Sequence, residues 1–296
     1  MLADIKIAHS VFALPFALLG AAMVAWPPED SGVQALSGGH VAIAVVLVIA
    51  AMIAARTAAM LSNRLLDREL DARNPRTAGR PLASGEASVR SYKIGLLAAA
   101  VVFIAITSLF WWLLANPWPL MLSIPVLAWI CSYGLFKRFT ALCHVWLGAS
   151  LAISVPAAAI AVHGEAISAV PSIWFLSAMV LCWVAGFDMI YALQDVTIDA
   201  DEGLHSAPSR LGVTGALWTS VVLHLLAVGF LVAAWWLDQR LGVVFLVGVA
   251  CVAILLVIEH ATVRRWGTTR MALTFFTLNG VVSCILGLTG IIDLVN

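Results

Sequence analysis

The sequence predicts an all-α integral membrane protein, a bundle of about nine transmembrane helices, and three observations support this class. Of the 296 residues, 62% are hydrophobic and only 11% are charged, whereas a soluble domain carries about a quarter charged residues. Apolar runs near the ~20 residues needed to cross a bilayer recur along the whole chain. These runs are about twice as long as a membrane-barrel strand and do not alternate with polar residues, so we expect helices.

Nine apolar runs define the predicted spans, and short polar breaks such as "NPW" and "LDQR" join neighbouring runs tightly. We expect them to form one transmembrane domain that covers residues 1–296. The runs cover residues 7–26, 40–62, 94–115, 118–136, 141–162, 171–193, 214–236, 241–258 and 271–292.

Basic residues predict the orientation of the bundle, because cytoplasmic loops are enriched in Lys and Arg. Among the odd-numbered connections, counted from the one after the first run, the only basic residue is Arg240, and Arg56 lies inside the second run. The remaining 14 of the 16 basic residues lie at the N-terminus or in the even-numbered connections. We therefore expect a cytoplasmic N-terminus, with the two long charged segments, 63–93 and 194–213, also on the cytoplasmic side.

The first charged segment begins with an amide and two carboxylates at helical spacing. Asn63, Asp67 and Asp71 are four residues apart, so they drift by only about 40° per step around a helix. Their oxygens are expected to share one face at the end of the second span.

The second charged segment repeats this arrangement four spans later. Asp188, Tyr191, Asp195 and Asp199 again fall on one predicted helix face, with Gly203 as a helix end. Asp188 is predicted to lie within the membrane, where an ionisable group is costly and usually functional.

Two facing carboxylate clusters repel each other unless a cation lies between them. Oxygen ligands without His or Cys suit Mg²⁺, which commonly binds one or two carboxylates together with substrate phosphates. The neighbouring arginines provide forked donors for phosphate oxygens. The residues alone therefore indicate a magnesium and diphosphate site at the cytoplasmic membrane surface, although charges that merely mark helix ends would also pair in this way.

Three motifs in order resemble the UbiA superfamily of intramembrane prenyltransferases. "NRLLDRELDARNPRTAGRPLASG" is similar to its first aspartate-rich signature, and "DMIYALQDVTIDADEGLHSAPSRLG" is similar to its second. "YGLFKRFTALCHVWLG" resembles the connection between spans 4 and 5. The resemblance covers nearly the whole chain, and nine spans match the family's architecture.

The resemblance implies Mg²⁺-dependent transfer of a polyprenyl group from an isoprenyl diphosphate to an aromatic acid. It implies two Mg²⁺ ions as cofactors and membrane lipid around the chain. The net charge of zero provides no overall field that would attract nucleic acid, so we expect no nucleic acid partner. The implied metal ligands, of which the carboxylates are also the catalytic residues, are Asn63, Asp67, Asp71, Asp195 and Asp199.

Further residues receive roles through the same resemblance. Arg76, Arg80 and Lys137 are candidates for contact with the diphosphate, and Arg138 is a candidate for the carboxylate of the acceptor. Anchoring by the positive-inside rule is the alternative for the latter two. Asp188 and Tyr191 are candidates to orient the acceptor or to take its proton.

The first span departs from the pattern of members that act on 4-hydroxybenzoate. Those members often carry an Arg-x-Asp-Lys-Pro stretch there, whereas this chain reads "IKIAHSVFALPFALLG", with Lys6, His9 and Ser10. This stretch resembles a subgroup associated with menaquinone made through futalosine. The acceptor is therefore either 4-hydroxybenzoate or a dihydroxynaphthoate, in ubiquinone or menaquinone biosynthesis, and we expect a bacterial inner-membrane enzyme.

Two other functions fit part of the pattern. A transporter could use the intramembrane Asp188, but the acidic clusters lie at one membrane surface and no broken midplane helix is evident. A CDP-alcohol phosphotransferase also uses aspartates and metal, but the DG pair followed by an AR pair that opens its motif is missing here.

Overall fold

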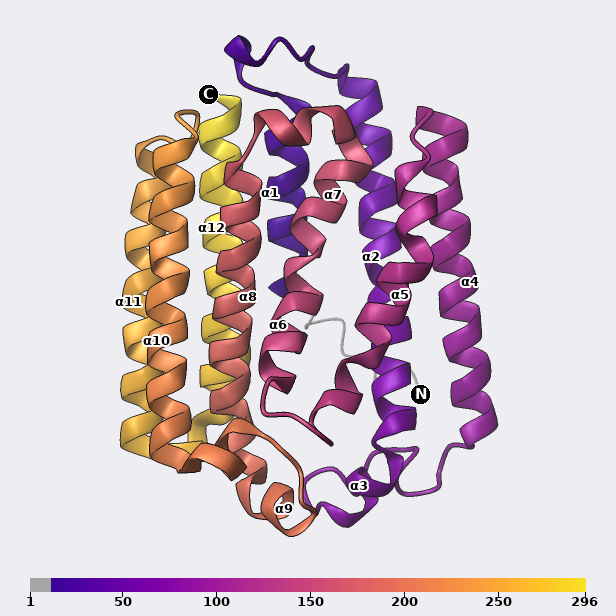
Figure 1. Cartoon of the computed structure of the whole chain (residues 1–296), viewed down its shortest axis with the longest axis vertical. Helices are drawn as coiled ribbons and strands as arrows, with labels where there is room; N and C mark the ends of the chain where they lie inside the picture. Colours follow the sequence, from indigo (N-terminus) through magenta and orange to yellow (C-terminus); the bar gives the residue numbers. More distant parts are fainter. Residues whose placement is uncertain (1–11) are drawn as a thin grey trace.

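The computed structural model describes residues 12–296, and within them the only regular secondary structure is helical. The long helices lie side by side along the longest axis of the molecule, and the two short helices α3 and α9 lie together at one end (Figure 1). The α-helices are α1 (Leu14–Ala25), α2 (Gly38–Leu66), α3 (Arg68–Arg73), α4 (Val89–Leu114), α5 (Trp118–Phe136), α6 (Cys143–Ala152), α7 (Ser154–His163), α8 (Ser172–Tyr191), α9 (Val196–Asp201), α10 (Ala207–Leu237), α11 (Val243–Trp266) and α12 (Asn279–Val295). Short 3₁₀ helices cover Glu29–Ser31, Gly164–Ala169, Ala192–Asp195 and Gly267–Arg270, and a π-helix covers Ala272–Leu278.

Each of the nine predicted spans falls on one or two of these helices. Eight helical stretches within residues 12–296 are long and apolar enough to cross a membrane, and α1 is a shorter apolar helix. The beginning of the first predicted span, with Lys6, His9 and Ser10, lies outside the described residues. The prediction of an all-α bundle of about nine helices is confirmed.

Helix starts follow local chemistry. Ser37 and Ser88 cap α2 and α4, because each side-chain hydroxyl accepts a hydrogen bond from the backbone N–H three residues later. Proline lies in the first turn of α1, α5 and α10, where its missing N–H leaves no helical bond unmade.

The fifth predicted span is interrupted between α6 and α7. Pro156 has no N–H to donate to the carbonyl of Ala152, four residues earlier. The hydroxyl of Ser177 on α8 donates to that carbonyl instead, at 3.0 Å. The break is thus satisfied by a neighbouring helix rather than by lipid.

Helix α8 is the centre of the bundle. In its most apolar window 67% of the residues are buried within the protein, compared with at most 44% in the other spans. It packs closely on α6, because a Cβ at Gly148 would approach the Leu181 carbonyl oxygen to 2.4 Å. Outer helices instead carry exposed apolar side chains, such as Trp112 and Trp236, which suit contact with lipid.

Candidate active site

Both acidic clusters lie at the same end of the bundle, where α2 leads into α3 and α8 leads towards α9 (Figure 1). In the first cluster, α2 ends at Leu66 and α3 begins at Arg68. The N–H of Asp67 still donates to Asn63 O at 2.9 Å, and that of Asp71 donates to Asp67 O at 2.7 Å. The helical spacing predicted for Asn63, Asp67 and Asp71 is therefore kept across the junction of α2 and α3.

The second cluster is not one continuous helix, and the prediction of a single regular face was wrong in this respect. Helix α8 ends at Tyr191, a 3₁₀ turn covers Ala192–Asp195, and α9 follows. The tighter 3₁₀ winding rotates Asp195 relative to Asp188. Gly203 lies two residues after α9 with φ +66°, which is consistent with its predicted place at a helix end.

A cavity of about 560 Å³ joins the two clusters. Along α2 its lining runs from Val48 to Asp67, about 28 Å of helix at 1.5 Å per residue. Its deeper walls are apolar and include Phe103 and Phe110. Of the residues predicted for the site, those that line the cavity are Asn63, Asp67, Asp71, Arg76, Arg80, Lys137, Asp188, Tyr191, Asp195 and Asp199.

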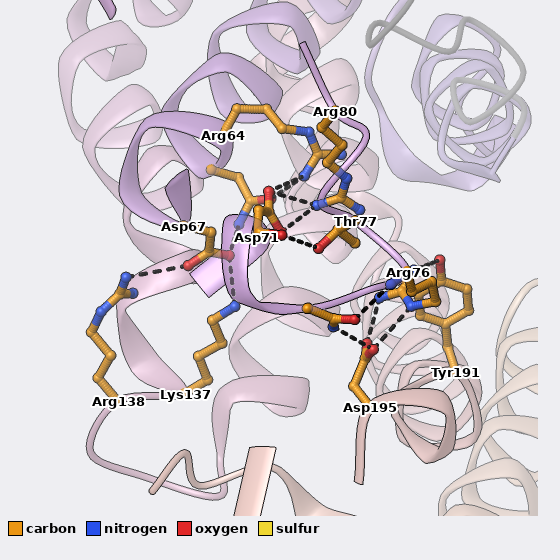
Figure 2. A network of polar contacts seen from close by, with 12 residues as sticks. Arg64, Asp67, Asp71, Arg76, Thr77, Arg80, Lys137, Arg138, Tyr191 and Asp195 are labelled. Atoms are coloured by element: carbon orange, nitrogen blue, oxygen red, sulfur yellow. Dashed lines mark hydrogen bonds and ion pairs between the residues drawn. The ribbon is translucent and has the colours of Figure 1, made fainter. Parts of the chain in front are cut away.

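The buried carboxylates of the first cluster are neutralised by cations (Figure 2). Lys137 Nζ lies 2.6 Å from Asp67 Oδ2, which also accepts from Asn63 Nδ2 at 3.0 Å. Arg80 Nη1 donates to both oxygens of Asp71, at 2.7 and 2.8 Å. Charge-assisted bonds of this kind offset the cost of burying the carboxylates.

The second cluster is neutralised across the site, by Arg76 from the segment after α3 (Figure 2). Its guanidinium donates to both oxygens of Asp195, with an Nε–Oδ1 distance of 2.9 Å, and to the hydroxyl of Tyr191 at 3.0 Å. Burial lowers the pKa of Arg76, but the hydrogen bond and charge of Asp195 outweigh this effect, so the pKa lies above its ordinary value. Arg76 therefore remains charged at any pH at which the protein works.

Two cavity carboxylates differ from these. Asp199 makes no salt bridge with any group in residues 12–296. Asp188 contacts His144, with 2.7 Å between Oδ2 and Nδ1. Both face the cavity from the α8–α9 side.

Arg138 is the one predicted site residue that the structure places elsewhere. Its guanidinium donates to the carbonyl oxygens of Gly134 and Leu66, at 2.8 and 2.6 Å, and lies 3.3 Å from Asp67 Oδ1. It lines a second, separate cavity on the outer side of α3 rather than the main one. Arg138 thus closes two helix ends, and its predicted contact with the acceptor carboxylate has no support from its position.

Arg56, Arg64 and His144 also line the main cavity, and sequence reasoning gave none of them a role. Arg56 makes no salt bridge within residues 12–296; its Nη2 lies 3.6 Å from the sulfur of Met60, and its buried Nε has no partner. The sequence feature that could have identified Arg56 is a single arginine inside an apolar span, where a charged residue usually has a function. No such signal marks His144, whose partners come from distant segments.

The donor set fits Mg²⁺, although no preformed cage is present. No group of three or more carboxylates, imidazoles or thiols converges within residues 12–296. Both clusters present carboxylate oxygens to the cavity, and Asp199 makes no salt bridge within the described residues. Hard cations prefer such oxygens, and Mg²⁺ takes part of its shell from substrate phosphates.

Comparison with known proteins agrees with this geometry. The model of the UbiA prenyltransferase family matches residues 13–287. A protein of Shewanella amazonensis named 4-hydroxybenzoate octaprenyltransferase is 30% identical over 246 residues, which cover 78% of each chain.

Solved structures of UbiA homologs have the same fold as this chain. A UbiA homolog from Aeropyrum pernix K1 superposes with a TM-score of 0.82 at 32% identity, covering 97% of this chain and 98% of the homolog. A UbiA homolog from Archaeoglobus fulgidus, bound to GPP and Mg²⁺, shares the fold at 17% identity, with a TM-score of 0.63 and 99% coverage of both chains. The family match over nearly the whole chain, together with the paired aspartate clusters, means that this protein is a multi-pass membrane prenyltransferase of the UbiA family.

Proposed function

We propose that this enzyme transfers a polyprenyl group from an isoprenyl diphosphate to an aromatic acid, either 4-hydroxybenzoate or a dihydroxynaphthoate, with Mg²⁺ as its cofactor. The observation that carries the proposal is the cavity, which joins two carboxylate clusters and their cations at one end to a long apolar interior. The polar end suits a diphosphate with its metal, and the apolar part suits a prenyl tail. The names of relatives, and the GPP and Mg²⁺ bound to the Archaeoglobus fulgidus homolog, support the same substrate class.

The diphosphate is proposed to bind between the clusters. Asn63, Asp67, Asp71, Asp195 and Asp199 would hold two Mg²⁺ ions. When bound, Mg²⁺ supplies positive charge that neutralises the leaving diphosphate. Lys137, Arg76 and Arg80 are each paired with one of these carboxylates. A carboxylate that turns to the metal would free its partner to donate to diphosphate oxygens.

The acceptor is proposed to bind deeper, with its carboxylate on Arg56. Arg56 precedes Asp67 by 11 residues, about 16 Å along α2. Asp188 precedes Asp195 by seven residues, about 12 Å along the end of α8 and the 3₁₀ turn that follows it. An acid held by Arg56 would therefore place its ring at the level of Asp188. A buried guanidinium without an acidic partner is a strong site for such a carboxylate.

The reaction needs three changes at this site. The allylic carbon–oxygen bond breaks and diphosphate leaves with the electron pair. A ring carbon of the acceptor attacks the allylic carbon, and the ring then loses its proton. Asp188 is proposed to take the phenolic proton as the ring attacks, and to return it to the same oxygen when the ring proton leaves with the diphosphate. One proton is then released in total, and the product is again a phenol. Tyr191, whose hydroxyl accepts a hydrogen bond from Arg76, is proposed to orient the acceptor.

The position of the enzyme in the cell follows from charge. The basic connections and both acidic clusters lie at one end of the bundle (Figure 1), which by the positive-inside rule is the cytoplasmic end. We propose that residues 1–296 act as one transmembrane domain in a bacterial inner membrane, in ubiquinone or menaquinone biosynthesis.

Product analysis tests the proposed reaction. Purified protein in detergent with geranyl diphosphate, Mg²⁺ and a panel of aromatic acids should give one prenylated acid, identified by mass spectrometry. EDTA should abolish the product, and added Mg²⁺ should restore it. Full turnover in chelator would refute the metal assignment, and no product with any acid would refute the acceptor class.

The acceptor site has its own test. Arg56→Ala should raise KM for the aromatic acid by roughly tenfold or more, because a charge-assisted bond to the carboxylate is lost. KM for the diphosphate should change much less. Arg138→Ala is the comparison variant for KM of the acid, since its guanidinium contacts Asp67 but lies outside the main cavity. A larger acceptor effect in Arg138→Ala than in Arg56→Ala would contradict the assignment.

A further inference from the structure

His144 joins the cavity carboxylate Asp188 to the start of α10. The imidazole is only 4% exposed, and its Nδ1 lies 2.7 Å from Asp188 Oδ2. On the other side of the ring, Nε2 accepts a hydrogen bond from the backbone N–H of Ala207 at 3.0 Å. Both ring nitrogens are therefore engaged, and by groups of opposite kind.

These two bonds determine where the proton of the ring lies. A backbone N–H can only donate, so Nε2 must be the unprotonated nitrogen. The proton of the neutral ring is then on Nδ1, which donates it to Asp188. Oδ2 of Asp188 is then the acceptor of this bond, and its second oxygen makes no hydrogen bond among residues 12–296.

The donor that sets this tautomer is itself held in place. His205 N donates to the carbonyl of Lys137 at 2.7 Å, and Cys143 Sγ lies 3.8 Å from His205 O. The segment before α10 is thus fixed to the turn that precedes α6. These contacts hold the segment that carries the Ala207 N–H next to the imidazole.

A pair of histidines elsewhere in the bundle, the buried His224 and the half-buried His260, provides a comparison for His144. His224 and His260 bond to each other at 3.0 Å, and His224 also contacts the Trp183 carbonyl at 3.3 Å. Neither lines the main cavity or touches a carboxylate within the described chain. His144 differs from them in both respects.

We propose that His144 is a positioning residue for the transfer reaction: its Nδ1–H holds one oxygen of Asp188, so that the other oxygen is turned to take the proton of the acceptor. The inference rests on the proposed role of Asp188 as the base. It predicts that the Nδ1–H donor matters for turnover, whereas the Nε2 acceptor only sets the tautomer.

Two amide substitutions separate the two bonds. The amide of asparagine lies where Nδ1 lies, so His144→Asn keeps a donor towards Asp188. The amide of glutamine lies where Nε2 lies, so His144→Gln keeps only the contact to Ala207. His144→Asn should retain kcat within a few-fold, and His144→Gln should lose roughly tenfold or more, with KM for prenyl diphosphate nearly unchanged in both. His163→Gln, at a histidine that binds the Val24 carbonyl, is the matched control and should keep wild-type kcat.

The reverse ranking, with glutamine active and asparagine inactive, would overturn the proposal and make the Ala207 contact the important one. Equal activity of both variants with the wild type would also overturn it. If Asp188→Asn keeps full kcat, the proposed base is wrong, and this outcome is distinct from loss only in the His144 variants.

A spectroscopic readout does not need turnover. With ¹⁵N-labelled histidine, the imidazole signal that disappears in His144→Asn should be that of a neutral ring protonated on Nδ1. A doubly protonated ring, or one protonated on Nε2, would contradict the arrangement whatever the activity shows.

Discussion

The two aspartate clusters look alike in sequence but are built differently. Residues 63–80 contain carboxylates and five arginines, whereas residues 188–206 contain carboxylates and no lysine or arginine. Asp71 is therefore paired within its own segment, with Arg80. Asp195 obtains its cation from the other segment, through Arg76.

The difference shows how charge holds the site together. Arg76 to Asp195 and Arg73 to Glu202 both run from the first segment to the second. Asp199 has no such partner and is the cavity carboxylate that a metal can take without breaking a salt bridge within the described chain. Asp71 thus has its cation within the first segment, and Asp67 has Lys137 and Arg138 at the end of α5. In the second segment, Asp195 depends on a cation from the first.

The largest effect is expected from removing cluster carboxylates. Asp71→Asn, Asp195→Asn and Asp199→Asn should each lower kcat by about 10²–10³, because each weakens a metal that stabilises the leaving group. Asp201→Asn, at an exposed position off the cavity, is the control.

Thermal unfolding in detergent should distinguish the two clusters further. Asp71→Asn should lower Tm because Arg80 loses its anion, whereas Asp199→Asn should leave Tm unchanged. An equal Tm for the two variants would contradict the difference between the clusters.

An intermediate effect is expected at the cation that crosses between the clusters. Arg76→Lys keeps the charge but cannot hold both oxygens of Asp195 and the Tyr191 hydroxyl together. KM for prenyl diphosphate should rise by roughly tenfold, since about one charge-assisted bond is lost. Steady-state kinetics with Arg68→Lys, at an exposed arginine, as a reference would check this. An unchanged KM would mean that Arg76 serves Asp195 only.

The smallest effect is expected at the exposed link between the segments. The bridge from Arg73 Nε to Glu202 Oε1 is 2.6 Å long, but the arginine side chain is 53% exposed. A double-mutant cycle of Arg73→Ala and Glu202→Ala should give a coupling in the free energy of unfolding of about 1 kcal/mol or less. A coupling well above this value would show that the outer bridge, and not Arg76, is the main link.

Much of the architecture was predictable because it depends on local sequence. The run 118–136 coincides with α5, and the other predicted spans also fall on helices, although the fifth is divided between α6 and α7. Apolar length decides what can cross a bilayer, so it is read from the sequence. The four-residue spacing of Asn63, Asp67 and Asp71 likewise placed these groups in one cavity. The sequence by itself thus determined the spans, the shared end of the charged segments and most of the cavity carboxylates.

Only the tertiary structure decided which groups meet. The sequence could not tell that Arg138 would bond helix carbonyls while Arg56 stayed without an acid, or that His144 would lie between Asp188 and Ala207. The bonds of Arg138 to Leu66 and of His144 to Asp188 and Ala207 join residues that are 44 to 72 positions apart. The lack of an acidic partner at Arg56 likewise depends on how the other helices pack. Helical periodicity fixes the face on which a side chain lies, but its partner is fixed by the packing of other helices against that face.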